Sequence, residues 1–340
     1  MPVRARDLGL AWGKRPTGPR NAITDVPGVL VGHRTLRDGD SIRTGVTAIL
    51  PHGDNLFHGK VPAAVHVLNG FGKSVGLVQV EELGELETPI LLTNTFGVAA
   101  CAETLIRRAF TEEPRIGRET STVNPVVMEC NDGFLNDIQA LAVTPADATA
   151  AIGAAGEEFA SGAVGAGTGM SCYGLKGGIG TASRRLKFDG TRFNLGALVL
   201  ANFGRAGELR LPDGRQVPAS ASEDAPERGS VIVVIATDVP LESRQLRRVA
   251  TRAGAGIAWT GSSWGHGSGD IFLAFSTAQR LPHDAPTHIL PRQSLAEARL
   301  DRLFEAAAEA TAEAVIDAMA AAETTTGFQG HRRQGLRDVI

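Results

Sequence analysis

Cysteine is scarce in this sequence. The three cysteines, Cys101, Cys130 and Cys172, lie far apart and form no CxxC motif. An odd number of widely spaced cysteines argues against a disulfide framework. We therefore expect three free, buried thiols.

Strong net charge and long apolar runs are missing as well. The formal net charge is -3, so nothing favours binding to phosphate backbones or anionic lipid. Apolar runs such as 231–237 are too short to span a bilayer. The basic segment 1–20 contains no apolar core and no Arg-Arg pair, which argues against Sec and twin-arginine signals. We expect a cytoplasmic protein without nucleic-acid or membrane partners.

Familiar catalytic and nucleotide motifs are absent or out of place. There is no HExxH, and the eight histidines are scattered, so no metal site is predicted. The glycines of 165–169 lack the spacing and the strand-to-helix setting of a dinucleotide loop. GSSWG at 261–265 fits GxSxG, but a predicted helix precedes it and a predicted strand follows. A nucleophile elbow needs the opposite order.

Glycine, by contrast, is abundant, with 41 residues, which indicates tight turns and close backbone contacts. Short apolar segments bounded by turn residues predict strands at 28–32, 45–50, 63–67, 89–93, 125–129, 195–201, 231–237 and 271–276. Helices are predicted at 95–110, 145–162, 241–260 and 294–326, with Thr144 capping the second and Ser294 and Glu297 forming a capping box for the last. This mixture predicts an α/β or α+β layered domain.

The junction Gly229-Ser230 is the first candidate site. The polar, proline-containing segment 205–228 predicts an exposed loop, and an apolar strand begins directly after it. A serine there can attack the preceding carbonyl, form an ester by N→O acyl shift and be released by water. The new α-amino group, with a reference pKa of about 8, can then activate its own hydroxyl. A plain loop-to-strand turn is the alternative.

Three other segments carry candidate groups. The glycine-rich loop 261–270 offers Ser268 and Asp270, a hydroxyl and a carboxylate that can support a catalytic centre. Asn202 ends a strand, where its amide can donate to an oxyanion. ECND at 129–132 can line a pocket and bind an amine, or close an Asx turn. The glycine-rich stretch 161–182 is predicted to pack beside the site, with Lys176 contacting it.

Together these segments resemble the L-aminopeptidase/D-esterase and β-peptidyl aminopeptidase family of self-processing N-terminal-nucleophile hydrolases. The resemblance covers nearly the whole chain, with the blocks in the family's order. The eight blocks are NAITDVPGVLVGH (21–33), NGFGKSVGLVQVEELG (69–84), TNTFGVAACAETLIRR (93–108), NPVVMECNDGFLND (124–137), GAGTGMSCYGLKGGIGTASR (165–184), LVLANFG (198–204), GSVIVVIATDVPL (229–241) and GHGSGDIFLAFST (265–277).

The resemblance implies an α+β fold, a four-layer αββα sandwich similar to N-terminal-nucleophile hydrolases but with different connectivity. It implies one domain, 1–340, cleaved into an α chain, 1–229, and a β chain, 230–340, that assemble as a homotetramer. The implied activity is that of a serine aminopeptidase or amidase acting on small peptides, amides or esters. No metal or organic cofactor is implied.

The resemblance also assigns roles to individual residues. Ser230 corresponds to the nucleophile, Ser268 and Asp270 to its supporting pair, and Asn202 to the oxyanion donor. Some relatives have glutamate in place of Asp270.

Two further assignments concern the substrate pocket. Relatives often carry tyrosine at the position of Asn131. Glu129 or Asp132 is expected to hold the free amine of the substrate.

Two other functions fit parts of the pattern. Ornithine acetyltransferases share this style of self-cleavage, but they cleave before threonine, and this chain has serine. An uncleaved relative kept as a binding scaffold is the non-enzymatic alternative.

Overall fold

A computed structural model describes residues 3–218 and 229–340, and its centre is a pair of stacked sheets. The first sheet contains, in spatial order, β1 (Leu30–Asp38), β2 (Ile42–Leu50), β5 (Ile90–Asn94) and β6 (Val126–Cys130). The β1–β2 and β2–β5 pairs are antiparallel, whereas β5 and β6 are parallel.

The second sheet interleaves distant parts of the chain. Its order is β13 (Leu281–Pro282), β3 (Gly59–Gly70), β12 (Gly269–Ser276), β11 (Ser230–Thr237), β10 (Thr191–Asn202) and β9 (Gly178–Phe188), with β4 (Glu85–Leu86) paired to β3. Only β11 and β12 pair in parallel. Two short pairs lie outside both sheets, β7 (Ser171–Cys172) with β8 (Leu175–Lys176), and β14 (Thr325–Thr326) with β15 (Arg332–Arg333).

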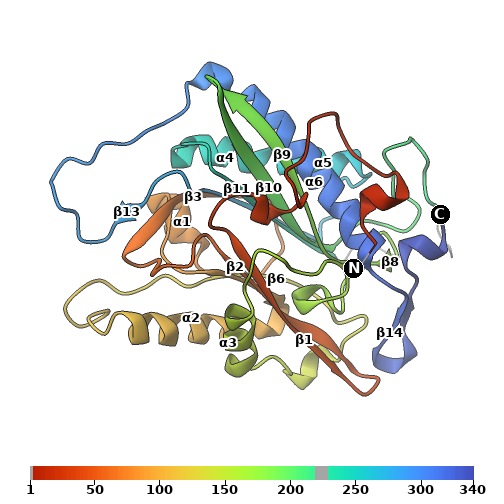
Figure 1. Ribbon diagram of the computed structural model, residues 1–340. Coiled ribbons are helices and arrows are strands. Elements are labelled where there is room, and N and C mark those ends of the chain that lie inside the picture. Colours follow the sequence, from red (N-terminus) through yellow and green to blue (C-terminus); the bar gives the residue numbers. More distant parts are fainter. Residues whose placement is uncertain (1–2, 219–228) are drawn as a thin grey trace.

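Helices cover the outer faces of both sheets. Figure 1 shows α2 (Val98–Glu112) and α3 (Pro145–Gly153) on one side, and α4 (Ser243–Thr251), α5 (Ala253–Trp259) and α6 (Asp301–Ala321) on the other. The short α1 (Leu77–Leu83) contacts β3. The expected four-layer αββα arrangement is confirmed. Within 3–218 and 229–340, no helix combines the length and the apolar character that a membrane crossing requires.

Side chains alternating along β11 contribute to two hydrophobic cores. Ile232 and Val234 lie in the core between the sheets, whereas Val231 and Val233 lie in the core beneath α4–α6. Strand β5 alternates in the same way between the inter-sheet core and the core beneath α2 and α3. Because successive side chains of a strand point to opposite faces, a buried strand must be apolar on both. This explains the unbroken apolar run at 231–236.

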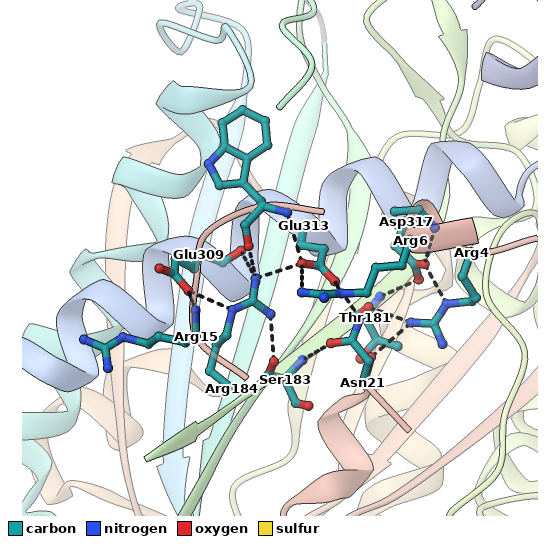
Figure 2. Close-up of polar contacts among 12 residues, drawn as sticks. Arg4, Arg6, Arg15, Asn21, Thr181, Ser183, Arg184, Glu309, Glu313 and Asp317 are labelled. Carbon is teal, nitrogen blue, oxygen red and sulfur yellow. Dashed lines mark hydrogen bonds and ion pairs between the residues drawn. The ribbon is translucent and has the colours of Figure 1, made fainter. Parts of the chain in front are cut away.

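A buried ionic network ties β9 and the N-terminal segment to α6 (Figure 2). Arg184, on β9, bonds Glu309 at 2.9 Å and Glu313 at 2.8 Å, and the side chains of Arg184 and Glu313 are fully buried. Arg6 also bonds Glu313, and Arg4 bonds Asp317, both at 2.6 Å. Burial alone would raise the pKa of Glu313, but the hydrogen bond from Arg6 and the charge of Arg184 lower it.

All eight predicted strands are present, but two predicted helices are wrong in extent. The helix predicted at 145–162 ends at Gly153, because the chain then turns to pair Gly156 with Val31. The helix predicted at 241–260 is two helices, α4 and α5. A Cβ on Gly256, in α5, would lie 2.4 Å from a carbonyl oxygen of α6, so the glycine permits close helix packing.

The predicted start of the last helix is wrong as well. Helix α6 begins at Asp301, and Ser294 does not cap it. The carboxylate of Glu297, expected in a capping box, instead bonds Arg248 at 2.7 Å and Gln245 at 2.8 Å. By contrast, Thr144 caps α3 as predicted and accepts a hydrogen bond from the amide of Asp147.

The segment predicted as an exposed loop, 205–228, is partly buried. Leu209, Leu211 and Val217 belong to the core beneath α4–α6. The prediction is therefore wrong for its first half, since these apolar side chains fill space that the helices leave open. Residues 219–228 lie outside the described residues.

Candidate active site

Ser230 is the first residue of β11 and lies between two strands. In the sheet it pairs with Asn202, the last residue of β10, and with Gly269, the first of β12. Its hydroxyl donates to the carbonyl oxygen of Gly229 at 2.7 Å and accepts from the amide of Gly269 at 3.2 Å. The side chain is buried. The register of three strands therefore holds this hydroxyl beside the carbonyl group of the preceding residue.

Gly229 fits this position because it has no side chain. A Cβ here would lie 2.2 Å from the carbonyl oxygen of Asn202 and 2.7 Å from the Cα of Phe203. Real Cβ contacts are essentially never this short, so any other residue would push the 229–230 peptide away from β10. Close packing against the end of β10 therefore requires glycine at this position.

Ser268 and Asp270 form a pair at the start of β12. The Ser268 hydroxyl donates to Oδ1 of Asp270 at 2.7 Å, and both side chains are fully buried. They flank Gly269, whose amide contacts the Ser230 hydroxyl. The structure brings this predicted supporting pair to within one residue of the contact with Ser230.

Asn202 is anchored through both ends of its side-chain amide. Its Oδ1 accepts from the backbone amide of Ser171 at 2.9 Å, and its Nδ2 donates to the carbonyl of Asn131 at 2.9 Å. An amide nitrogen carries two hydrogens, so one remains for a further acceptor. The anchoring fixes the direction of that hydrogen on a residue that is the strand partner of Ser230.

The segment 129–131 reaches the site from the other sheet. Oε1 of Glu129 accepts from the amide of Lys73 at 2.7 Å, and Oε2 accepts from the hydroxyl of Thr95. The side chain of Asn131 instead bonds the amide of Gly133, which is the Asx turn weighed as an alternative. Glu129 keeps free lone pairs for a cation, whereas Oδ1 of Asn131 accepts the hydrogen bond of its turn.

Asp132 is buried apart from this arrangement. Its Oδ1 accepts from Asn136 at 3.0 Å, and a Cβ on Gly169 would lie 2.9 Å from its own Cβ. Burial raises the pKa of Asp132 to about 6. No group of His, Cys, Asp and Glu suited to holding a metal ion occurs in the part of the chain that the structure describes.

Two contacts at the site were not anticipated from the sequence. The thiol of Cys130, expected only as a buried cysteine, donates to the carbonyl of Ser230 at 3.4 Å. The backbone amide of Ser171 orients Asn202. Neither contact has a local sequence signal, because each depends on which strands become neighbours.

Solved structures of related proteins define the class. A Burkholderia sp. β-aminopeptidase superposes with a TM-score of 0.90 at 41% identity, covering 99% of both chains. The L-aminopeptidase D-Ala-esterase/amidase of Ochrobactrum anthropi gives 0.89 at 39% identity, covering 98% of this chain and 95% of its own. The latter is described as a prototype for the serine aminopeptidases and as a new variant of the Ntn hydrolase fold. The chain shares this α+β fold.

The sequence comparisons give the family. The model of peptidase family S58 matches residues 21–333. The β-peptidyl aminopeptidase BapA of Sphingosinicella microcystinivorans is 39% identical over 360 residues, which cover 98% of this chain and 89% of that protein. The chain belongs to peptidase family S58 and is a hydrolase of the aminopeptidase/amidase type.

Proposed function

We propose that this aminopeptidase activates itself by cleaving between Gly229 and Ser230, and that Ser230 is its nucleophile. One observation carries the proposal. The Ser230 hydroxyl lies 2.7 Å from the carbonyl oxygen of the residue before it, at the start of a strand paired on both sides. A reactive group held next to its target by a rigid sheet gains a large advantage in effective concentration.

The cleavage proceeds by an acyl shift. The Ser230 oxygen attacks the carbonyl carbon of Gly229, and its proton passes to the departing nitrogen as the C–N bond breaks. An ester then joins Gly229 to the Ser230 oxygen. Water hydrolyses this ester, leaving a carboxylate on Gly229 and a free amine and hydroxyl on Ser230. The products are a 1–229 chain and a 230–340 chain.

The mature site repeats this chemistry on a substrate. The free amine of Ser230 accepts the hydroxyl proton, and the oxygen attacks the carbonyl of an amide or ester. The spare hydrogen of Asn202 Nδ2 stabilises the oxyanion, a contribution worth roughly 10²–10³ in rate when one donor is removed. Ser268 and Asp270 orient the Ser230 amine. The amine or alcohol of the substrate leaves with the proton that the Ser230 amine accepted, as its bond to the carbonyl carbon breaks. Water then hydrolyses the ester on Ser230 and releases the acyl group.

The substrates that fit are small amides, esters and peptides with a free amino group, such as amino-acid amides, amino-acid esters or β-peptides. Glu129 supplies the negative charge that holds the amine, supported by its buried position at the end of β6 and by its fixed carboxylate. The names of the relatives support the same classes. We further assign the enzyme to the cytoplasm, in keeping with three buried cysteines that form no disulfide. The family resemblance supports a homotetramer.

The test is the intact mass of the purified protein beside Ser230→Ala under denaturing conditions. We expect wild type to give two chains split at 229/230, and the variant to stay whole and inactive toward alanine p-nitroanilide. A wild-type chain that stays whole after long incubation, or a variant that still splits at this bond, would refute the assignment of Ser230.

A further inference from the structure

Lys176, on β8, is a buried lysine held by main-chain carbonyls. Its side chain is fully buried. Its Nζ donates to the carbonyl oxygens of Gly167 at 3.1 Å, Met170 at 2.8 Å and Gly177 at 2.8 Å. Three acceptors match the three hydrogens of an ammonium group. Among residues 3–218 and 229–340, no carboxylate forms an ion pair with it.

A lysine in this position is costly, because burial disfavours its charge. Burial, together with the charge of Arg37, lowers the pKa of Lys176 to about 7, while Cys172 and Asp132 oppose this shift. A methionine would fill the same space without that cost. Filling the core therefore does not explain why a lysine occupies this position.

The hydrogen bond from Lys176 to Met170 indicates a role for this lysine. The carbonyl of Met170 and the amide N–H of Ser171 belong to the same peptide group, which is planar and rigid. Lys176 holds the oxygen end of this group at 2.8 Å, and its N–H end donates to Oδ1 of Asn202 at 2.9 Å. A cation on the carbonyl also polarises the peptide and strengthens its N–H as a donor.

The loop around the 170–171 peptide packs closely against the end of β10. The amide of Gly177 donates to the same Met170 carbonyl at 2.9 Å. A Cβ on Gly177 would lie 2.2 Å from the carbonyl oxygen of Ala201, the residue before Asn202. Loop and strand therefore touch with no side chain between them, so a shift of the peptide passes directly to the Asn202 amide.

The geometry points to Lys176 as a positioning residue that sets the orientation of Asn202 through the 170–171 peptide, and so aims the oxyanion donor at the acyl group on Ser230. The inference rests on the proposed role of Asn202. The Lys176 Nζ bonds main-chain carbonyls and is not a partner of the Ser230 hydroxyl. Its removal therefore affects the chemical step and leaves substrate binding in place.

The experiment compares Lys176→Met and Lys176→Gln with wild type in two assays. The first is the rate constant of self-cleavage, followed by intact mass. The second is kcat and KM of the cleaved fraction on alanine p-nitroanilide. We expect Lys176→Met to lower both rate constants about 10–100-fold, less than the loss of the donor itself, with KM within about twofold. Lys176→Gln keeps two N–H donors, so its rate constants should lie between those of wild type and those of Lys176→Met. It also serves as the test if the methionine variant does not fold.

Lys60→Met is the matched control. Lys60 is also largely buried and bonds Glu85 and Glu87, at 2.7 and 3.1 Å, near the opposite end of β3 from the site. Its loss should lower thermal stability without changing kcat. A similar fall in kcat for Lys60→Met would mean that any buried lysine disturbs the enzyme, and would overturn the inference.

A double-mutant cycle with Asn202→Ala separates the possible failures. If Lys176 acts through Asn202, adding Lys176→Met to Asn202→Ala lowers the cleavage rate by less than about twofold more. A further 10–100-fold loss in the double variant would refute the positioning role of Lys176 and leave the proposed role of Asn202 in place. Wild-type rates in Asn202→Ala would instead refute the proposed oxyanion donor.

Discussion

Gly229 is confined by the backbone of its neighbours. The carbonyl of Asn202 and the backbone of Phe203 occupy the space that a side chain would need. These same contacts set the direction of the Gly229 carbonyl toward Ser230. Packing and reactivity at this bond are therefore controlled by the same few atoms.

Gly229→Ala should consequently slow self-cleavage by about 10²-fold, since small displacements of reacting groups have effects of that size. The matched control is Gly153→Ala at the end of α3, where a Cβ would meet nothing within 4 Å. Cleavage rates from intact mass, with thermal unfolding as the check on folding, decide the matter. Equal cleavage rates in the two variants would show that the packing around Gly229 does not set the rate.

Glu129 permits a second test on a single side chain. Glu129→Gln keeps the size of the side chain but removes the charge that we propose holds the amine of the substrate. KM for alanine p-nitroanilide should rise at least about tenfold, as expected when a charged hydrogen bond is lost. Asp132→Asn is the companion variant, because its carboxylate is buried against Asn136. A larger effect in Asp132→Asn would transfer the amine-binding role to that residue.

At the level of elements, the sequence predicts strands and helices better than their ends. Strand β11 is predictable because its apolar run is bounded by Gly229. Strand β9 was missed, since it carries Arg184 on a buried face, and the partners of Arg184, Glu309 and Glu313, lie more than 100 residues away. Ser230 could likewise be singled out from the sequence, but the contact of its carbonyl with Cys130 and the contact of Asn202 with Ser171 could not. These contacts depend on strand register.

The corrected start of α6 gives a prediction for that element. The hydrogen bond from Arg244 lowers the pKa of Glu297. The resulting stability is present above the ordinary pKa of about 4.5 and is lost as the pH falls through the lowered value. Glu297→Gln should therefore lower Tm at pH 7 but not near pH 3, whereas Ser294→Ala should leave Tm unchanged at both. A fall in Tm for Ser294→Ala would restore the capping box.

For the whole molecule, the buried network on α6 forms a polar link between 1–229 and 230–340. Glu313→Gln leaves Arg184 and Arg6 without part of their compensating charge, and should cost about 3–5 kcal/mol. Glu305→Gln, on the same helix but in an exposed pair with Arg15, should cost less than about 1 kcal/mol. Urea unfolding measures both losses of unfolding free energy when the two variants are made in the Ser230→Ala background, where the proposed cleavage is blocked. Equal losses would mean that burial of the network adds nothing to its stabilising effect.

The interleaved order of the second sheet has a consequence for how the protein refolds before and after the proposed cleavage. Strands β11 and β12, from 230–340, lie between β3 and β10, from 1–229. Before cleavage the protein refolds as one molecule, at a rate that does not depend on its concentration. After the proposed cleavage, the two unfolded pieces would have to meet in solution before they could refold. The proposed mature enzyme would therefore keep its structure through slow unfolding more than through refolding.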